Sequence, residues 1–451
     1  MTSQVKDKMS AAKKVSASGA SGSVSLLPIY SVNFIGALGF TIVLPFLVFL
    51  ITRWGGNALV YGLIGATYSA FQLVGAPILG RWSDRYGRRK ILLLSQLGTL
   101  LSWVVFVFAF FLPLEPSWSV DSSLFGKFVL TLPLVVLFVA RAADGLTGGN
   151  VSVANAYLAD VTGEEERSTN FGKMAVAANL GFILGPAIAG LLAATALGEL
   201  VPVLAAVAIS LVATLIIAFR LPESRPCVLS RDPEHGSVRK VFGQEHKACF
   251  EMKGAPKLSL RETARLTGVP LLLTIYFLVM LGFNFFYVAF PVYAVGNLRW
   301  SVTDIGIFFS VMGLLLVVVQ GPILSRVARK VADGTLILVG SLILAVGFAF
   351  FASPNDARIY TGVVLMALGN GLMWPSVVSL LSKAAGDRYQ GAVQGVAGSL
   401  GAAASILGLI LGGLLFGVLE GSVFWVSTGI ILLVAGLSLP TLRVPGPTHT
   451  D

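Results

Sequence analysis

The stretch Gly80-Arg81-Trp82-Ser83-Asp84-Arg85-Tyr86-Gly87-Arg88-Arg89-Lys90 lies between two long apolar runs and decides how the chain is arranged. It carries five basic residues and one acidic residue in eleven positions, and hydrocarbon does not accommodate so many charges. We therefore expect a tight turn at a membrane surface, where Gly80 ends one helix against a close neighbour and Gly87 lets the backbone reverse. Short loops rich in Lys and Arg stay on the cytoplasmic side, so this turn orients the surrounding spans.

The composition is that of a polytopic membrane protein. Of 451 residues, 55% are hydrophobic and 12% are charged, whereas soluble proteins carry about 25% charged residues. The net charge of +10 is spread over many short loops, which argues against nucleic acid as a partner. Cys227 and Cys249 lack metal-ligand spacing, and His235, His246 and His449 lie outside the apolar runs. We therefore expect no metal site and no histidine proton relay within the membrane.

Twelve apolar runs are each near or above the roughly 20 residues that a helix needs to cross the hydrocarbon. The predicted spans are 26–51, 58–79, 91–113, 128–158, 171–194, 199–219, 270–295, 304–324, 334–352, 359–382, 390–418 and 421–441. The predicted fold is therefore all-α, with twelve transmembrane helices in two pseudo-symmetric six-helix halves. Its expected parts are a disordered cytoplasmic tail (1–25), an N-terminal half (26–220), a cytoplasmic linker (221–267), a C-terminal half (268–441) and a cytoplasmic tail (442–451).

The basic residues support this topology with both termini in the cytoplasm. Of the 32 Lys and Arg residues, Arg53, Lys127, Arg299 and Arg358 fall in outside loops and Arg141 lies within a span, which leaves 27 inside. That asymmetry is the one that the positive-inside rule requires. We expect a multi-pass protein of the cell (inner or plasma) membrane that works as a monomer in the lipid bilayer.

The two halves carry an internal repeat. Ala76-Pro77-Ile78-Leu79-Gly80-Arg81 is echoed by Gly321-Pro322-Ile323-Leu324-Ser325-Arg326 at the same place in the second half. At matching offsets further on, Arg88 corresponds to Asp333, so the charges are exchanged. Repeated halves place a substrate site at their interface near the midplane in many transporters.

The fourth span carries the one pair of opposite charges at hydrocarbon depth. Arg141 lies about ten residues into the span, roughly 15 Å deep, and Asp144 follows three residues later on the same helical face. An arginine at that depth is costly unless it is paired or hydrated, so we expect it to face a water-filled interior. Asp144 then exchanges a proton while Arg141 orients substrate or stabilises the carboxylate, or the two form a static ion pair.

Other polar and aromatic residues within the spans are candidates for the substrate cavity. The amides are Asn33, Gln72, Asn155, Asn179, Asn284 and Asn370, and each of them could equally serve as an interhelical hydrogen-bond partner. The seventh span is rich in aromatic residues, among them Tyr287, which with Trp374 could form an apolar wall for a bulky ligand or face the lipid. In the fifth span Gly181, Gly185 and Gly190 clear one face for a neighbouring helix, and Pro186 bends it.

Together these motifs resemble the major facilitator superfamily over nearly the whole chain. Gly80–Lys90 resembles its signature loop between the second and third spans, Arg141 with Gly145 its fourth-span motif, and Gly181–Gly190 its antiporter motif. The segments Asp144–Asn150, Ala156–Thr162, Glu166–Arg167, Phe171–Gly172 and Leu221–Ser224 are similar to the tetracycline-resistance-like branch of proton-linked drug exporters.

The resemblance implies rocker-type alternating access, with the first, fourth, seventh and tenth spans lining the cavity. It also implies a cytoplasmic gate that contains Gly80, Asp84, Arg85, Gly87, Arg88, Arg89 and Asp160. Within that gate Asp84, Arg88 and Asp160 are expected to form a charge cluster, with Asp84 near the start of the eleventh span. Many relatives carry an acid nine positions before the first-span proline, but here Gly36 precedes Pro45 at that distance. More of the proton coupling is therefore expected of Asp144.

The predicted function is secondary active transport, namely proton-coupled efflux of drugs or other amphiphilic small molecules. A metabolite facilitator or symporter is the alternative within transport, and a non-transporting sensor on the same fold is the alternative outside it. No nucleophile, base or metal constellation indicates an enzyme, and no phosphate-binding loop indicates ATP as the energy source. The expected partners are therefore a small-molecule substrate and protons, without a cofactor.

Overall fold

The computed structural model describes residues 25–148, 150–162, 164–224 and 266–443, which are mostly helical. The expected disordered tails, most of the linker, both cysteines and all three histidines lie outside the described residues. The N-terminal half comprises α2 (Leu27–Thr41), α3 (Leu44–Arg53), α4 (Ala58–Tyr86), α5 (Arg88–Ala109), α6 (Leu132–Thr147), α7 (Asn150–Val161), α8 (Glu164–Ala193) and α9 (Leu200–Arg220). The C-terminal half comprises α11 (Val269–Gly296), α12 (Val302–Val318), η2 (Val319–Ile323), α13 (Leu324–Val327), α14 (Asp333–Phe350), α15 (Asp356–Leu419), η3 (Glu420–Ser422), α16 (Val423–Ser438) and η4 (Leu439–Arg443).

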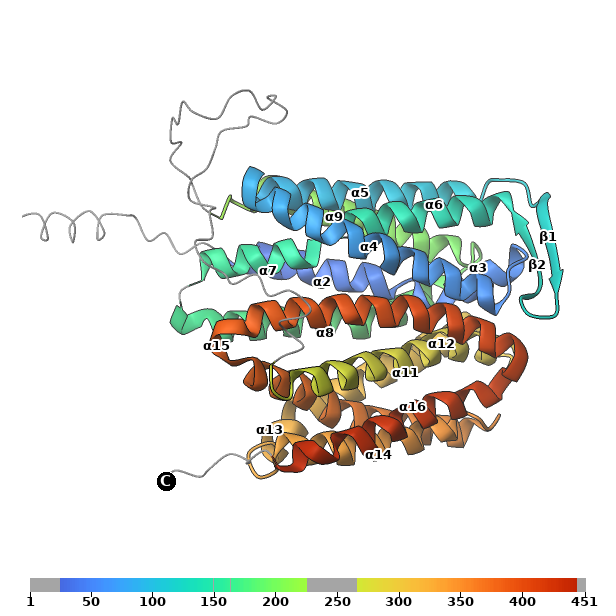
Figure 1. Ribbon diagram of the computed structural model, residues 1–451. Helices are drawn as coiled ribbons and strands as arrows, with labels where there is room; N and C mark the ends of the chain where they lie inside the picture. Colours follow the sequence, from blue (N-terminus) through green and yellow to red (C-terminus); the bar gives the residue numbers. More distant parts are fainter. Residues whose placement is uncertain (1–24, 149, 163, 225–265, 444–451) are drawn as a thin grey trace, which may run out of the picture.

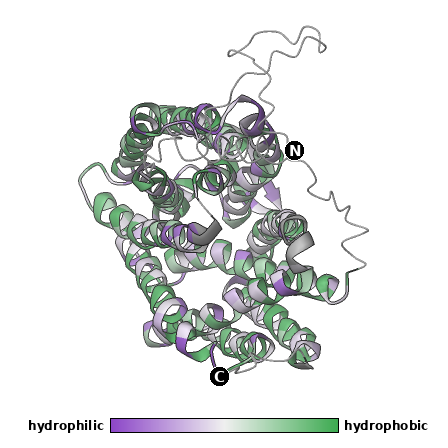
Figure 2. Ribbon diagram, turned by 90° about the vertical axis from the view of Figure 1, so that its left-hand side faces the viewer, coloured by the Kyte–Doolittle hydropathy of each residue, from purple (hydrophilic) through white to green (hydrophobic). Residues whose placement is uncertain are grey.

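The helices form two groups that lie side by side, with apolar residues on the outside of both (Figures 1 and 2). Among the described residues, eleven helical runs are long and apolar enough to cross a membrane. The last of them, Val393–Leu442, has 50 residues and contains the end of α15, a short turn and α16. A single helix of that length would measure roughly 75 Å, far more than the bilayer thickness, so the run makes two crossings. The predicted twelve-helix fold is confirmed.

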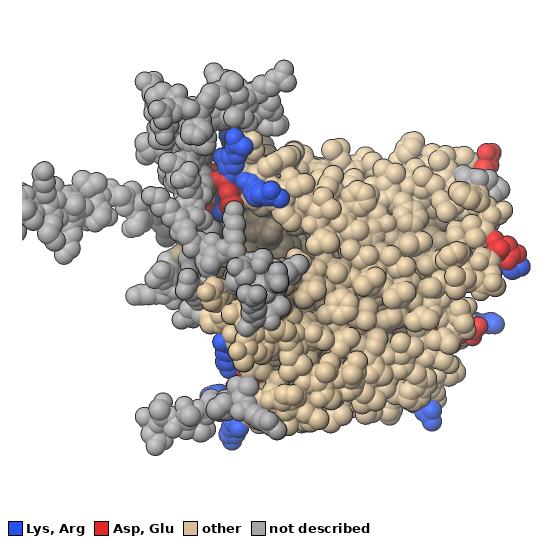
Figure 3. All heavy atoms as spheres, viewed as in Figure 1, with Lys and Arg blue, Asp and Glu red and all other residues tan. Residues whose placement is uncertain are grey.

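The charged side chains gather at the two ends of the bundle and leave the flank between them apolar (Figure 3). We call the end that carries the turn at Gly87 the basic end. The opposite end carries an antiparallel hairpin of β1 (Pro116–Ser122) and β2 (Gly126–Thr131), and we call it the hairpin end. The hairpin was not predicted, and residues 128–131, which were assigned to the fourth span, lie in β2.

The motif Gly80–Lys90 corrects one prediction. The α4 helix does not end at Gly80 but continues to Tyr86, and only Gly87 leaves the helical conformation, with φ 103° and ψ 144°. Arg88 then begins α5. The polar half of the motif can stay helical because it lies beyond the hydrocarbon, where charged side chains are solvated. The reversal itself needs only the one positive-φ glycine.

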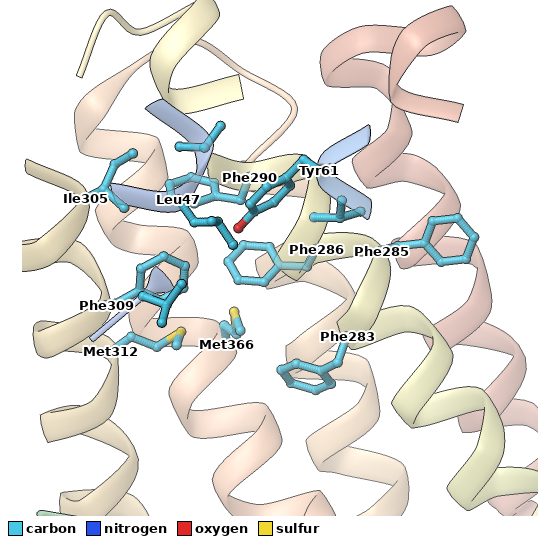
Figure 4. Packing of buried hydrophobic residues seen from close by; sticks show 14 of the residues in the cluster. Leu47, Tyr61, Phe283, Phe285, Phe286, Phe290, Ile305, Phe309, Met312 and Met366 are labelled. Carbon is cyan, nitrogen blue, oxygen red and sulfur yellow. The ribbon is translucent and has the colours of Figure 1, made fainter. Parts of the chain in front are cut away.

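The two halves are in backbone contact at the hairpin end. A Cβ atom added to Gly62 of α4 would lie 2.1 Å from the Leu409 carbonyl oxygen of α15, and one added to Gly413 would lie 2.5 Å from that of Ala58. A buried apolar cluster closes the same end, where Leu47 and Tyr61 of the N-terminal half meet Phe286, Phe290 and Ile305 of the other half (Figure 4).

Towards the basic end the halves separate. Positions Gly80 on α4 and Gly395 and Gly398 on α15 would meet no atom within 4 Å of an added Cβ. A second buried cluster at this end consists of residues of the N-terminal half alone. The space-filling view shows a hollow between the halves that opens at the basic end (Figure 3). The structure is therefore closed at the hairpin end and open at the basic end.

Gly75 and Gly80 both lie within α4 but have different surroundings. A Cβ at Gly75 would lie 2.0 Å from the Leu146 carbonyl oxygen of α6, whereas Gly80 has open space around it. We expect Gly75→Ala to destabilise the protein by about 1–3 kcal/mol, because α4 and α6 must move apart. Gly80→Ala should leave stability unchanged or raise it slightly, since alanine is favoured over glycine within a helix by about 1 kcal/mol. Thermal unfolding in detergent measures both variants, and equal losses would contradict this assignment.

Candidate functional site

The charged pair of the fourth span lies inside the N-terminal half. Nη1 of Arg141 is 3.2 Å from Oδ2 of Asp144, and the two side chains are 9% and 12% exposed. The guanidinium carbon of Arg141 lies 4.6 Å from the ring centroid of Tyr68 on α4, which adds a cation–π contact. The Tyr68 hydroxyl accepts a hydrogen bond from Gln72, which also donates to the Gly148 carbonyl. The pair is thus embedded between α4, α5 and α6.

One atom of this pair has no hydrogen-bond partner among the described residues. It is Nε of Arg141, which is buried. Beside the pair lies a cavity of about 10 Å³ that is lined by Ser102, Trp103, Phe106, Ala140, Arg141 and Asp144, roughly the room that one water molecule needs. The Arg141 side chain therefore borders a small void between α5 and α6, and its exposure to a water-filled interior stays a prediction. An ion pair held so incompletely stabilises the fold little, because the desolvation of both charges offsets their attraction.

Two of the predicted asparagines serve as hydrogen-bond links between helices. Nδ2 of Asn33 on α2 donates to the Met174 carbonyl of α8 over 2.9 Å. Nδ2 of Asn284 on α11 donates to the Ser405 hydroxyl of α15 over 3.1 Å and also to its own helix. Each bond lies within one half, as the structural interpretation of these residues expects.

The aromatic candidates gather in the C-terminal half. The ring of Tyr287 stacks on Phe309 with centroids 6.2 Å apart, and Trp374 on α15 lies 4.8 Å from Tyr276 on α11. Asn370 is half-buried on the same helix as Trp374. The structure therefore brings Trp374 against the seventh predicted span, where an apolar wall was expected.

At the basic end Arg88 is the centre of a charge cluster. Its guanidinium lies 2.5 Å from Oδ1 of Asp84 and 3.0 Å from Oδ2 of Asp160, and it donates to the Ser83 hydroxyl over 2.6 Å. The Arg88 side chain is only 6% exposed. It therefore joins the end of α4 to the end of α7, as expected for the three charged residues. The side chains at residues 387, 388 and 390–392, at the start of the eleventh predicted span, lie outside the described part, so the expected approach of Asp84 stays a prediction.

The other residues assigned to the gate have different surroundings. Arg85 is exposed, with its guanidinium 5.7 Å from the ring centroid of Tyr86. Arg89 turns towards α9, where its side chain donates to the carbonyl oxygens of Ile217 and Ala218. Those carbonyls belong to the last turn of α9, where intrahelical donors run out. Arg89 is thus a cap for α9.

Glu223 is a residue of this cluster that sequence reasoning missed. Its Oε1 accepts hydrogen bonds from the backbone N–H groups of Arg88 (2.7 Å), Arg89 (3.3 Å) and Ser224 (3.2 Å). The first N–H groups of α5 need such an acceptor because Gly87 has no capping side chain, and a carboxylate also suits the positive end of the helix. The sequence contains a glycine just before the α5 helix and a glutamate just after the α9 helix. Their separation of more than a hundred residues does not indicate that they meet.

The start of the linker is therefore bound to the N-terminal half. The Ser224 hydroxyl donates to Oδ2 of Asp160 over 3.2 Å, and the Tyr157 hydroxyl donates to the Pro222 carbonyl over 3.0 Å. Leu221 is buried in the apolar cluster of that half. The segment Leu221–Ser224, which was assigned to the linker, packs as the last part of the N-terminal half.

The glycine motif of α8 packs against two different neighbours. Cβ atoms at Gly181 and Gly185 would lie 2.6 Å from the Phe34 carbonyl oxygen and 2.1 Å from the Thr41 hydroxyl of α2. Gly190 lies on the other side, against Thr303 and Gly306 of α12 in the C-terminal half. Pro186 lies within the continuous helix, and its carbonyl oxygen would be 2.7 Å from a Cβ at Gly306. The motif therefore ties α8 to its own half and to the opposite one.

Two six-helix halves, joined at one end and parted at the other, define a membrane transporter. The sequence matches the Major Facilitator Superfamily over residues 29–409 and 272–451, and the chain belongs to that family. It is a multi-pass secondary transporter and not an enzyme.

Relatives and solved structures agree with this assignment. The chain is 27% identical over 391 residues to the class C tetracycline resistance protein of Escherichia coli, with 86% of this chain and 88% of the relative covered. It is also 27% identical to multidrug resistance protein 1 of Bacillus subtilis (strain 168), with 92% and 95% covered. The human organic anion transporter MFSD10 has a similar structure, with a TM-score of 0.63, 21% identity, and 92% of this chain and 98% of that chain covered.

The role of Glu223 as a helix cap can be tested by stability. We expect Glu223→Ala to lower the free energy of unfolding by about 1 kcal/mol or more, because the N–H groups of Arg88 and Arg89 lose their acceptor. Glu223→Gln keeps one acceptor oxygen and should lose less. Asp121→Asn is a matched control, since Asp121 pairs with Lys127 on the hairpin and its side chain is 71% exposed. Thermal unfolding in detergent compares the three, and a Glu223→Ala protein as stable as the control would refute the cap.

Proposed function

We propose that this transporter exports drugs or related amphiphilic small molecules in exchange for protons, with its basic end in the cytoplasm. The relatives carry names that describe tetracycline and multidrug resistance, and they match most of the chain. The concentration of Lys and Arg at the end that carries the Gly87 turn supports the orientation. In that orientation the hollow faces the cytoplasm, which is the side from which an exporter takes its substrate. We propose the monomer in the cell membrane as the working unit.

The way in which the halves meet supports alternating access. They touch through glycines and an apolar cluster at the hairpin end, so an opening there needs the two halves to tilt about the interface. The basic end would close in the same motion. The cluster around Arg88 moves with the N-terminal half, because its partners Asp84, Asp160 and Glu223 all belong to that half.

The burial of the Arg141–Asp144 pair is the observation that carries the proton-coupling proposal. Protonation of Asp144 removes the charge that balances Arg141, and the guanidinium already has one N–H without a partner among the described residues. In the protonated state, α6 lowers its free energy by repacking against α4 and α5, where Tyr68 and the small void lie. A proton bound at this place therefore favours one arrangement of the half over another.

The test is transport of tetracycline and of a fluorescent amphiphilic dye in everted membrane vesicles with an imposed proton gradient. We expect the native chain to accumulate substrate only with the gradient, and Asp144→Asn to fall to the level of vesicles without one. Substrate binding should persist in the variant, because Asp144 lies within the packing of the N-terminal half. The exposed-site variant Asp121→Asn is the control for expression and insertion.

Other outcomes assign the protein differently. If Asp144→Asn still exchanges substrate for protons, the pair is structural and coupling lies elsewhere. If the native protein transports without regard to the gradient, it is a facilitator, and if it binds without transport, it is a sensor.

A further inference from the structure

The end of α8 meets the beginning of α12 across the two halves. The α8 helix ends at Ala193, and α12 begins after Ser301, whose hydroxyl accepts from the Asp304 N–H in a capping box. A Cβ at Gly306 would lie 2.9 Å from the Cα of Gly190. The two backbones are thus in direct contact at the hairpin end, and no side chain lies between them there.

A hydrogen bond joins the halves at this contact. The Thr303 hydroxyl of α12 donates to the Gly190 carbonyl oxygen of α8 over 2.9 Å. Gly190 is one of the last four residues of α8, whose carbonyl groups project from the end of the helix and are the ones that need partners from outside it. Thr303 therefore acts as a cap for α8 that is supplied by the opposite half.

The contact joins a helix end that presents carbonyl oxygens to the start of another helix. The C-terminal end of α8 carries partial negative charge, and the partial positive charge at the start of α12 is offset by the carboxylate of Asp304 in its first turn. The hydroxyl of Thr303, rather than an attraction between the helix ends, therefore favours the closed contact. When the halves part, the Gly190 carbonyl exchanges this donor for water.

We propose that Thr303 is a positioning residue whose bond to the Gly190 carbonyl sets how often this transporter opens at the hairpin end. The proposal rests on the alternating-access part of the proposed function and is independent of the substrate and of proton coupling. Removal of the hydroxyl should favour the open state, because the closed state alone uses the bond. A net hydrogen bond of about 1 kcal/mol corresponds to roughly a fivefold rise in the ratio of open to closed molecules.

The matched variants are Thr303→Val and Thr303→Ser. Valine keeps the branched shape and lacks the donor, whereas serine keeps the donor and lacks a methyl group. Both are made in the full chain with Cys227 and Cys249 replaced by serine, since these are its two cysteines. Spin labels at Ala196 and Asn297 report on the hairpin end, and labels at Lys173 and Lys330 report on the basic end, since all four positions are exposed. Distances are measured by double electron–electron resonance without substrate or gradient.

We expect Thr303→Val to increase the long-distance population at the hairpin end about fivefold, while the pair at the basic end shifts towards shorter distances. Thr303→Ser should keep the native distributions. A local structural defect would broaden one pair without the reciprocal shift in the other, so the two pairs distinguish the roles. Native distributions in Thr303→Val, or equal shifts in both variants, would overturn the proposal.

A second variant covers the case in which Thr303→Val does not fold. Gly306→Ala retains the hydroxyl but places a methyl group 2.7 Å from the Pro186 carbonyl oxygen. We expect it to push α12 from α8 and to produce the same reciprocal shift. Failure of this variant to shift either pair would show that the α8–α12 contact does not control the opening. The distance measurements do not involve drug transport, so a negative result overturns the role of Thr303 without bearing on the export proposal, which the vesicle experiment tests.

Discussion

The absence of water in hydrocarbon is the constraint on which the rest of this structure depends. A charge or a free backbone group has no solvent partner there, so the chain crosses as helices and keeps its charged residues at the two ends. The pair Arg141 and Asp144 is the exception at mid-helix, and the protein encloses it between three helices and an aromatic ring. Such a pair adds little to stability, which favours the proposed role in proton coupling over a role in packing.

Helix ends have the same need for partners, and this protein supplies several of them from distant segments. Glu223, just after α9, caps the first turn of α5, and Arg89 in that turn caps the last carbonyls of α9. Thr303 caps α8 from the opposite half. The first two bonds lie within the N-terminal half and join its segments. The third crosses between the halves, and in the alternating access proposed above it breaks when they separate.

The two halves repeat a motif but use it differently. In the N-terminal half Ala76–Arg81 stays within the α4 helix, whereas Gly321–Pro322 lies in a short π-helix, η2. The ion pairs at the basic end are also reversed. Arg88 at the start of α5 pairs with Asp160, while Asp333 at the start of α14 pairs with Lys383 over 2.7 Å. In each half an ion pair joins the corresponding helices, with the acidic and basic positions exchanged. This matches the exchange between Arg88 and Asp333 in the sequence.

The sequence by itself determined the twelve crossings, the two halves and the family, because apolar run length and charge position follow directly from the chemistry of the bilayer. It also predicted that Asp84, Arg88 and Asp160 would meet, although only through the family resemblance. The ends of helices were harder to predict where an apolar run passes into a polar segment, because the same polar residues suit a turn or a solvated helix. For this reason Gly80 was predicted to end a helix that in fact continues to Tyr86.

The tertiary structure alone decided which distant groups meet. Nothing in the spacing connects Glu223 with Arg88, or Thr303 with Gly190, since these contacts depend on how whole helices lie against one another. The hairpin of residues 116–131 was also missed, because its second strand is held by a contact distant in sequence, the bond from the Val129 N–H to the Gly55 carbonyl between α3 and α4. Composition sets where a segment lies relative to the membrane, whereas the packing of neighbours sets what its polar atoms bind.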